Sequence, residues 1–368
     1  MADRFLIVAA SIILLLVIKI NARDEGTVFC QDPNQFEGAC KHIKECSTVL
    51  NELVGKSYDN SYRQYIRQSN AICDHIKPLV CCPSDGRRNQ LTESSIQGRL
   101  LTPSEGCGFS NQNLRLKSGD KKRSRLGAFP WMALISYTDN LGETSWKCGG
   151  SLITTRHVLT SARCATPNLV NVRLGEYNFS SYDASVQDLK VIRTERHPNY
   201  NERDGTNDIA ILYLERDVHI SPRIRPTCLP TNDPIRSRSF VNYRPFLAGW
   251  DLLKKDGRPS NFPYEQQLTV LENESCKERY RQQGELASEN QFNKSVLCVG
   301  FFRGSLGDCQ SDLGSPLLQP VRYDERGDFR YYQIGIASYG FDCEKIDTPA
   351  VYTSVQYFID WIQERINS

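Results

Sequence analysis

Fourteen cysteines constrain the fold of this 368-residue chain more than any other feature of its sequence. All of them follow an apolar run over residues 5–18, which comes after Arg4 and ends near the small residue Ala22. This pattern is typical of a secretory signal peptide over residues 1–22, and the oxidising compartment beyond it favours disulfides over thiols. A membrane anchor is the alternative, although the run is shorter than the roughly 20 residues that span a bilayer. We therefore expect a secreted, disulfide-bonded protein.

Composition removes several other classes of function. The formal net charge is +2, with basic residues throughout the chain, so there is no electrostatic case for a nucleic acid or membrane-surface partner. Only five histidines occur, and none has metal-ligand spacing with a cysteine pair, so we expect neither a metal site nor a cofactor. Three Asn-x-Ser sequons, at Asn178, Asn273 and Asn293, predict glycosylation on the secretory route.

The cysteine spacing divides the chain into two modules. Six cysteines crowd residues 30–82, a segment too short to build much of a core, so disulfides are expected to stabilise it. Counting leaves fifteen pairings open for six cysteines. Residues 83–106 are polar, turn-rich and free of aromatics, which indicates a flexible linker and a domain boundary. A solvated loop inside one domain is the alternative.

The larger module is predicted to be mainly β. Short segments such as "WMALISY", "HVLTSA", "DIAILYL" and "YYQIGIASYG" are separated by Gly, Pro, Asn and Asp, a spacing typical of an all-β barrel or sandwich. Near the C-terminus, helical spacing puts five apolar residues on one face: Val355, Phe358, Ile359, Ile362 and Ile366. We expect an amphipathic C-terminal helix that packs on the β core.

Several motifs in order carry a family resemblance. "FPWMALI", "CGGSLITTRHVLTSARC", "VRLGEYNF", "NDIAIL", "LAGW" and "DTPAVYTSV" follow one another as in a trypsin-like serine protease. The six-cysteine module resembles a clip domain, so the chain is similar to the arthropod clip-domain serine proteases and their non-catalytic homologues. The resemblance implies a clip domain at 30–82, a linker at 83–115, and a trypsin-like (peptidase S1) domain at 116–368 with two six-stranded antiparallel β-barrels and a site between them.

The resemblance also implies a disulfide map that uses all fourteen cysteines. The implied pairs are Cys30–Cys81, Cys40–Cys73 and Cys46–Cys82 in the clip domain, and Cys107–Cys228, Cys148–Cys164, Cys276–Cys298 and Cys309–Cys343 in the rest of the chain.

The catalytic positions implied by the resemblance are degenerate. The triad carboxylate corresponds to Asp208, whereas the histidine position holds Arg163 and the serine position holds Leu313. Arginine stays protonated and cannot act as a general base, and leucine offers no nucleophile. We therefore predict that the chain is not an enzyme.

No neighbouring residue is expected to restore catalysis. Two glycines of the family pattern are replaced by Ser311 and Ser315, and a side chain at Ser311 would crowd the turn that presents the oxyanion-hole amide. Neither serine has a histidine nearby to activate it, because His157 lies in a predicted strand where a packing role is expected. The specificity pocket lacks its acidic floor, since Gly307 stands there with Asp308 next to it.

The activation end of the site also departs from the family. There, a new amino terminus pairs with the aspartate that precedes the nucleophile, which corresponds to Asp312. In this sequence, the segment that aligns with the family's new amino terminus is "SGDK" at 118–121, which would not give an apolar terminus after cleavage. Leu116 is apolar but lies two residues away from the aligned position. Basic residues between 115 and 123 make this stretch either a cleavage site for another trypsin-like enzyme or a solvated charged loop.

A buried Asp208 would need a partner in place of the histidine. We hypothesise that Arg163 pairs with it, with the guanidinium offering two parallel donors, while Leu313 adds apolar contact and helps to close the former cleft. The alternative is that Arg163 points into solvent.

The predicted function is that of a secreted, non-catalytic serine protease homologue. The resemblance implies a modulator of an extracellular protease cascade, above all prophenoloxidase activation and melanisation in innate immunity. Its partners would be the cascade's proteases or zymogens, or prophenoloxidase itself. Residues alone do not distinguish a cofactor from an inhibitor, or a haemolymph protein from a parasitoid venom protein. A pathogen-recognition or cell-adhesion protein is the alternative, and an active endopeptidase is the rival that the missing base and nucleophile argue against.

Overall fold

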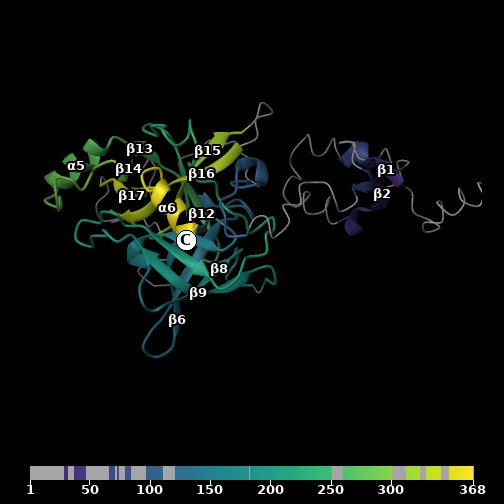
Figure 1. Ribbon diagram of the computed structural model, residues 1–368, viewed down its shortest axis with the longest axis horizontal. Coiled ribbons are helices and arrows are strands. Elements are labelled where there is room, and N and C mark those ends of the chain that lie inside the picture. Colours follow the sequence, from purple (N-terminus) through teal and green to yellow (C-terminus); the bar gives the residue numbers. More distant parts are fainter. Residues whose placement is uncertain are drawn as a thin grey trace, which may run out of the picture. The chain divides into compact units, whose positions relative to one another are not determined.

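The fold was analysed in a computed structural model, which describes residues 29–31, 37–46, 66–70, 73, 79–83, 97–110, 121–181, 183–250, 260–300, 312–323, 329–340 and 348–367. The chain divides into two compact units, Met1–Gln90 and Leu91–Ser368, traced in Figure 1. The expected signal peptide, Ser311, Gly307, Asp308 and the expected pair Cys309–Cys343 lie outside the described residues. In the part of the chain that is described, the helices are all too short or too polar to cross a bilayer.

The N-terminal unit contains a three-stranded antiparallel sheet stabilised by disulfides. Its strands β1 (Phe29–Gln31), β2 (Glu37–His42) and β3 (Leu79–Pro83) pair in the order β1-β2-β3, and the 3-10 helix η1 (Ile43–Glu45) follows β2. The buried cluster is small, with Val80 packed between Cys46 and Cys82. Three disulfides connect the unit: Cys30–Cys81, Cys40–Cys73 and Cys46–Cys82. These cross-links supply stability that so small a core cannot.

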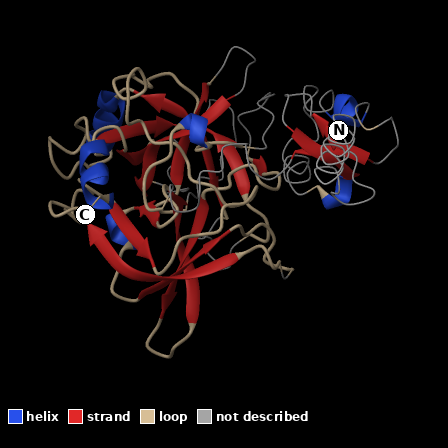
Figure 2. Ribbon diagram, turned by 45° about the vertical axis from the view of Figure 1, so that its right-hand side comes forward, coloured by secondary structure: helices blue, strands red, loops and turns tan. Residues whose placement is uncertain are grey.

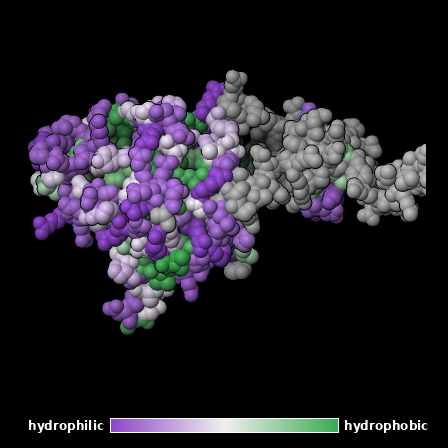
Figure 3. Space-filling model, in the orientation of Figure 1, coloured by the Kyte–Doolittle hydropathy of each residue, from purple (hydrophilic) through white to green (hydrophobic). Residues whose placement is uncertain are grey.

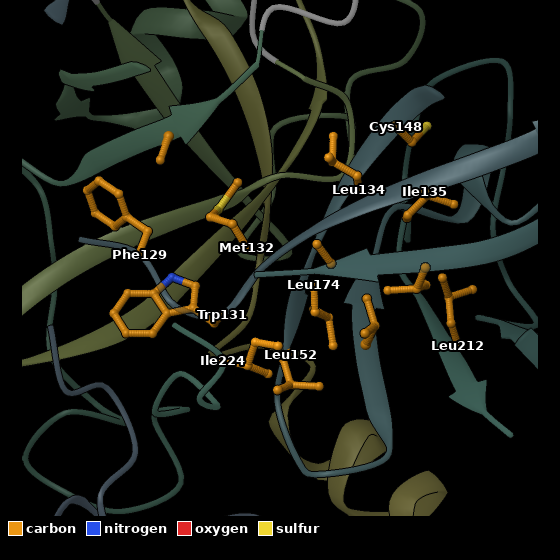
Figure 4. Packing of buried hydrophobic residues seen from close by; sticks show 14 of the residues in the cluster. Phe129, Trp131, Met132, Leu134, Ile135, Cys148, Leu152, Leu174, Leu212 and Ile224 are labelled. Carbon is orange, nitrogen blue, oxygen red and sulfur yellow. The ribbon is translucent and has the colours of Figure 1, made fainter. Parts of the chain in front are cut away.

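The larger unit is built mostly from strands, with its helices at the periphery (Figure 2). Its first barrel closes in the order β10-β7-β6-β5-β8-β9 and has antiparallel neighbours throughout. The strands are β5 (Met132–Thr138), β6 (Thr144–Leu152), β7 (His157–Thr160), β8 (Leu169–Leu174), β9 (Gln187–Arg196) and β10 (Ala210–Leu214). Figure 4 shows part of its core, in which Leu134, Leu152, Leu174 and Leu212 are completely buried.

The second barrel is an eight-stranded sheet in the order β13-β14-β17-β16-β15-β11-β12-β4. Its strands are β4 (Lys122–Arg123), β11 (Phe246–Gly249), β12 (Tyr264–Gln267), β13 (Thr269–Leu271), β14 (Val296–Gly300), β15 (Pro316–Arg322), β16 (Phe329–Tyr339) and β17 (Ala350–Ser354). Only Leu268 separates β12 from β13, so these two strands form one continuous chain segment. The β12 part of this segment pairs with β11 and the β13 part pairs with β14, and together these pairings close the barrel. Six chain segments therefore form the barrel and β4 is added to β12. The predicted trypsin-like double barrel is confirmed.

The C-terminal helix packs as the spacing predicts. Helix α6 (Ile359–Ile366) begins after the buried residues Val355 and Phe358, and Ile359 and Ile362 are completely buried. They meet Ile153, Leu159 and Ile211 of the first barrel and Ile336 of the second in one cluster. A second helix, α5 (Asn273–Gln282), is linked to β14 by Cys276–Cys298. The face drawn in Figure 3 is mostly hydrophilic, with hydrophobic residues in a few small groups.

The expected linker at 83–115 is wrong over residues 97–110, which we call the strap. The strap folds onto the larger unit through Cys107–Cys228 and through Gly98, whose amide donates to Thr155 Oγ1 at 3.0 Å. It contains the 3-10 helix η2 (Pro103–Glu105), which starts with a capping box between Thr102 and Glu105. At Gly108 (φ +64°) a Cβ would lie 2.4 Å from the Tyr331 carbonyl oxygen, so only glycine allows this close approach.

Candidate functional site

Asp208 is the centre of the candidate site between the barrels. It precedes β10, is completely buried and accepts three hydrogen bonds. The backbone amide of Arg163 donates to Oδ1 at 2.9 Å, and Arg163 Nε donates to Oδ2 at 3.0 Å. Ser338 Oγ, from β16, donates to Oδ2 at 2.6 Å. Both oxygens of the carboxylate therefore have hydrogen-bond donors.

Arg163 is held in place by its neighbours in the chain. It lies in the 3-10 helix η3 (Ala162–Cys164) directly after β7, and Cys148–Cys164 fixes the end of that helix to β6. Its side chain is 29% exposed, and its guanidinium carbon lies 6.0 Å from the centroid of the Tyr339 ring. Arg163 thus bridges a buried carboxylate and the surface.

The pairing of Arg163 with Asp208 is present, but its geometry differs from the expected one. The guanidinium contributes one donor, Nε, and the second donor from this residue is its backbone amide. Within the described residues, the two Nη groups donate no hydrogen bond. The physical reason is that the short η3 turn already directs the amide toward Oδ1, which leaves room at the carboxylate for a single side-chain nitrogen beside Ser338.

Leu313 stands where the resemblance places a nucleophile, immediately before β15. Its side chain is partly buried and packs against the core of the first barrel, and its carbonyl oxygen accepts from the Gly149 amide at 2.8 Å. The next residue, Gly314 (φ +80°), leaves no room for a side chain, since a Cβ there would lie 2.2 Å from Thr160 Oγ1. The turn is therefore tightly fixed, and the group it presents is an aliphatic side chain.

Ser315 and His157 are both buried. Ser315 is completely buried and its Oγ has no hydrogen-bond partner. His157, in β7, is 5% exposed, lies 2.7 Å from Thr154 Oγ1 through Nδ1, and packs edge-on against Tyr213. Burial lowers the pKa of His157 to about 4, so it is a neutral packing residue at physiological pH.

Asp312, expected to pair with a new amino terminus, is completely buried and accepts from the Trp250 amide at 2.5 Å. Residues 111–120 lie outside the described part of the chain. From Lys121 onward the segment is anchored: β4 pairs with β12, Lys122 Nζ lies 3.0 Å from Glu265 Oε1, and the Arg123 guanidinium covers the Phe262 ring at 3.2 Å. The basic stretch is therefore fixed at its C-terminal end.

Among the described residues, one group has potential ligand atoms close enough together to hold a metal ion. These atoms are the sulfurs of Cys30, Cys40 and Cys73. All three are engaged in disulfides, Cys30 with Cys81 and Cys40 with Cys73, so they are not metal ligands. The six disulfides of the described residues have the pairings that the resemblance implies.

The three sequons differ in what their side chains do. Asn178 Oδ1 accepts from Ser180 Oγ at 2.7 Å, and Asn293 is exposed, so the amide nitrogen of each is available to a glycan. Asn273 Nδ2, in contrast, donates to the carbonyl oxygens of Asn293 at 2.8 Å and Val296 at 3.0 Å, at the start of α5. A glycan on this nitrogen would replace one of its two hydrogens and so remove at least one of these hydrogen bonds, which argues against the predicted modification of Asn273.

Sequence reasoning missed Ser338 and Tyr339, which approach the Arg163–Asp208 pair from the second barrel. They lie 130 residues or more from Asp208, and the strand "YYQIGIASYG" gives no periodic signal for a polar contact. Only the closure of the two barrels on each other brings them to the site.

Two family models match the chain. The trypsin model matches residues 119–362, and the model of the regulatory CLIP domain of proteinases matches residues 30–82. Over 340 residues the chain is 36% identical to venom serine protease Bi-VSP of Bombus ignitus, covering 90% of each chain. It is 31% identical over 357 residues to the proclotting enzyme of Tachypleus tridentatus (92% of this chain, 89% of that one). Melanization protease 1 of Drosophila melanogaster is 30% identical over 385 residues (92% and 93%).

A solved structure shows the same architecture. The crystal structure of Drosophila Grass, a clip serine protease of the Toll pathway, superimposes with a TM-score of 0.60 at 26% sequence identity, covering 92% of this chain and 97% of the other.

Proposed function

Because the chain belongs to the arthropod clip-domain serine proteases of the trypsin family, we propose that it is a secreted, non-catalytic member that modulates an extracellular protease cascade. The fold is then a binding scaffold, since fold and function are separable.

One observation carries the loss of catalysis: Arg163 Nε donates the hydrogen bond to Asp208 that the triad histidine donates in an active protease. An arginine in this position orients nothing that can accept a proton, because the guanidinium stays protonated at physiological pH. Leu313 at the nucleophile position, packed on the first barrel's core, supports the same proposal.

The names of the relatives support a cascade rather than digestion. A proclotting enzyme, a melanization protease and a Toll-pathway protease are proteins that act within protease cascades. We propose prophenoloxidase activation as the cascade, with a protease, its zymogen or prophenoloxidase as the partner, in haemolymph or delivered in venom.

The loss of catalysis is tested by active-site labelling. The mature chain, before and after treatment with trypsin, is incubated with a fluorophosphonate probe, with trypsin itself as the positive control. We expect no covalent label in residues 91–368, and a labelled serine in that range would overturn the proposal.

The cascade role is tested by adding the purified protein to cell-free haemolymph and measuring the rate of phenoloxidase activation. We expect a dose-dependent change whose sign distinguishes a cofactor from an inhibitor. Reduced and alkylated protein is the matched control. An unchanged rate over the whole dose range, with binding to microbial cells instead, would favour the adhesion alternative.

A further inference from the structure

A pocket of about 350 Å³ lies on the larger unit, away from the residues of the Arg163 site. Its wall combines the strap, the loop after Cys228 and strands β15 and β16. Apolar side chains of Leu101, Leu229, Ile235 and Val321 line part of it, and three arginines line the remainder. The pocket therefore offers both apolar surface and positive charge, the usual character of a binding site.

Two of the three arginines in the wall form no ion pair with the described residues. Arg238 is half-buried, and within the described residues its guanidinium forms no hydrogen bond and no ion pair. Arg330 donates to the carbonyl oxygens of Pro103 at 3.3 Å and Phe329 at 3.0 Å but forms no ion pair with the described residues. Arg322 lies at the rim, and Asp233 is the one acidic residue among the described residues of the wall.

Aromatic rings border the same pocket. Tyr323 and Tyr332 line it, and Tyr323 is 41% exposed with its ring centroid 4.4 Å from the Arg330 guanidinium carbon. Tyrosine and arginine are the residue types most enriched where protein partners bind tightly. An exposed tyrosine ring stacked on Arg330 in the wall of a pocket thus points to a protein partner.

A neighbouring arginine, Arg225, lies close to Arg330. Arg225 and Arg330 lie on the Phe109 ring, with guanidinium carbons 5.6 Å and 5.5 Å from its centroid. Burial, with the like charge of Arg330 as the second cause, lowers the pKa of Arg225 below its usual value. A bound anion at Arg330 would relieve this repulsion, whereas a second cation would increase it.

We propose that this pocket binds an acidic peptide segment of a partner protein. Carboxylates of the segment pair with Arg238 and Arg330, and its apolar side chains pack against Leu229 and Ile235. A peptide fits better than a sulfated polysaccharide, because the site is concave and partly apolar rather than a flat basic surface. The inference does not rest on the absence of catalysis, since the pocket shares no residue with the Arg163 site.

The test uses the whole mature chain and a defined probe. A fluorescein-labelled eight-residue peptide that alternates glutamate with leucine is titrated by fluorescence anisotropy at low ionic strength. We expect saturable binding that weakens with added salt, because the pairing is electrostatic. Hydrogen exchange should slow in residues 101–107 and 229–238 when the peptide is bound.

Variants make the assignment specific. Arg238→Glu should weaken peptide binding by at least about tenfold, or roughly 1.4 kcal/mol, and Arg238→Lys should restore part of the affinity. The matched control is Arg203→Glu, which makes the same charge change at an exposed residue outside the pocket and should leave the affinity unchanged.

Three results would overturn the proposal. They are the absence of saturable peptide binding, equal weakening by Arg203→Glu and Arg238→Glu, and tighter binding of heparin than of the peptide with the same dependence on Arg238. The last result would assign the pocket to a polysaccharide.

Discussion

Arg163 gives Asp208 the hydrogen bond that the family resemblance assigns to a histidine, and in the proposed function it does not take over the histidine's chemistry. Its Nε and backbone amide satisfy Asp208 together with Ser338, so the buried carboxylate keeps a full set of partners after the loss of the base. The order of the family motifs was sufficient to locate all three triad positions in the sequence. The rotamer of Arg163 could not be predicted, because Tyr339 and Gly205, which border its guanidinium, come from distant segments.

Removal of the arginine side chain should destabilise the larger unit. Arg163→Ala leaves the buried charge of Asp208 without its cation, which costs about 3 kcal/mol where one partner of a buried pair is lost. The urea midpoint of unfolding should fall, and Asp208→Asn combined with Arg163→Gln should recover part of the loss. Arg163→His, which keeps one donor toward Asp208, is the control and should lose less. An unchanged midpoint in Arg163→Ala would show that the pair contributes nothing to stability.

Restoring two catalytic residues should not restore catalysis. In the double variant Arg163→His with Leu313→Ser, Ser311 still stands in place of a glycine two residues before the new serine. Asp312 already accepts a hydrogen bond from the Trp250 amide, although no new amino terminus has been released to pair with it. We expect hydrolysis of peptide substrates to stay at background. Rapid hydrolysis by the double variant would mean that these further changes matter little.

His157 should make the larger unit sensitive to mild acid. Its folded-state pKa of about 4 lies below the ordinary value of 6.5, so the neutral form is favoured in the folded state. Stability is then complete above about pH 6.5 and is lost as the pH falls toward 4, by about 3 kcal/mol in total. His157→Asn should flatten this part of the profile of unfolding free energy against pH. The control is His219→Asn, at an exposed histidine, and an equal effect of both variants would contradict the assignment.

At the scale of elements, the strap is where sequence reasoning failed. Its polar composition predicts a linker, yet its capping sequence, Thr102 followed by Glu105 three residues later, is a local signal for an ordered turn. Leu100 and Cys107 then attach this turn to the larger unit. Strands and the C-terminal helix were predictable from their periodicity, whereas the order of the strap also depends on contacts with distant segments, such as the Cys107–Cys228 disulfide and the hydrogen bond from Gly98 to Thr155.

Trypsin should spare the strap. Arg99 forms a salt bridge with Glu105 at 2.7 Å, so we expect cuts at basic residues of 84–96 and 111–120 before any cut at Arg99. A cut at Arg115 leaves both fragments joined through Cys107–Cys228 until reduction. Peptide mapping with non-reducing gels measures both outcomes, and Glu105→Gln should expose Arg99. An early cut at Arg99 in the unmodified chain would contradict an ordered strap.

The hydrogen bonds at the start of helix α5 allow a prediction of which sequons are glycosylated. Asn273 is committed to the start of this helix, so Asn273→Gln should lower the unfolding midpoint without removing a glycan. Asn178→Gln and Asn293→Gln should each remove one glycan, as measured by intact mass before and after deglycosylation. A glycan located on Asn273 by peptide mass spectrometry would contradict this assignment.

At the scale of the whole molecule, the ordered motifs were sufficient to predict two barrels, because each motif belongs to a strand or turn that the barrel closure requires. They were insufficient for the surface. The basic pocket forms from the strap, the loop after Cys228 and strands β15 and β16, which lie up to about 230 residues apart in the chain. Such a surface has no compact signature in sequence.

The replacement of a titratable histidine by arginine also has a consequence for how the centre of the molecule responds to its surroundings. An imidazole beside Asp208 would gain or lose its charge near neutral pH, so an active relative carries a proton-dependent charge in its cleft. Arg163 keeps one charge from acid to alkali. A ligand that contacts Arg163, whose side chain is 29% exposed, therefore meets a guanidinium charge that stays the same over the pH range in which an imidazole titrates.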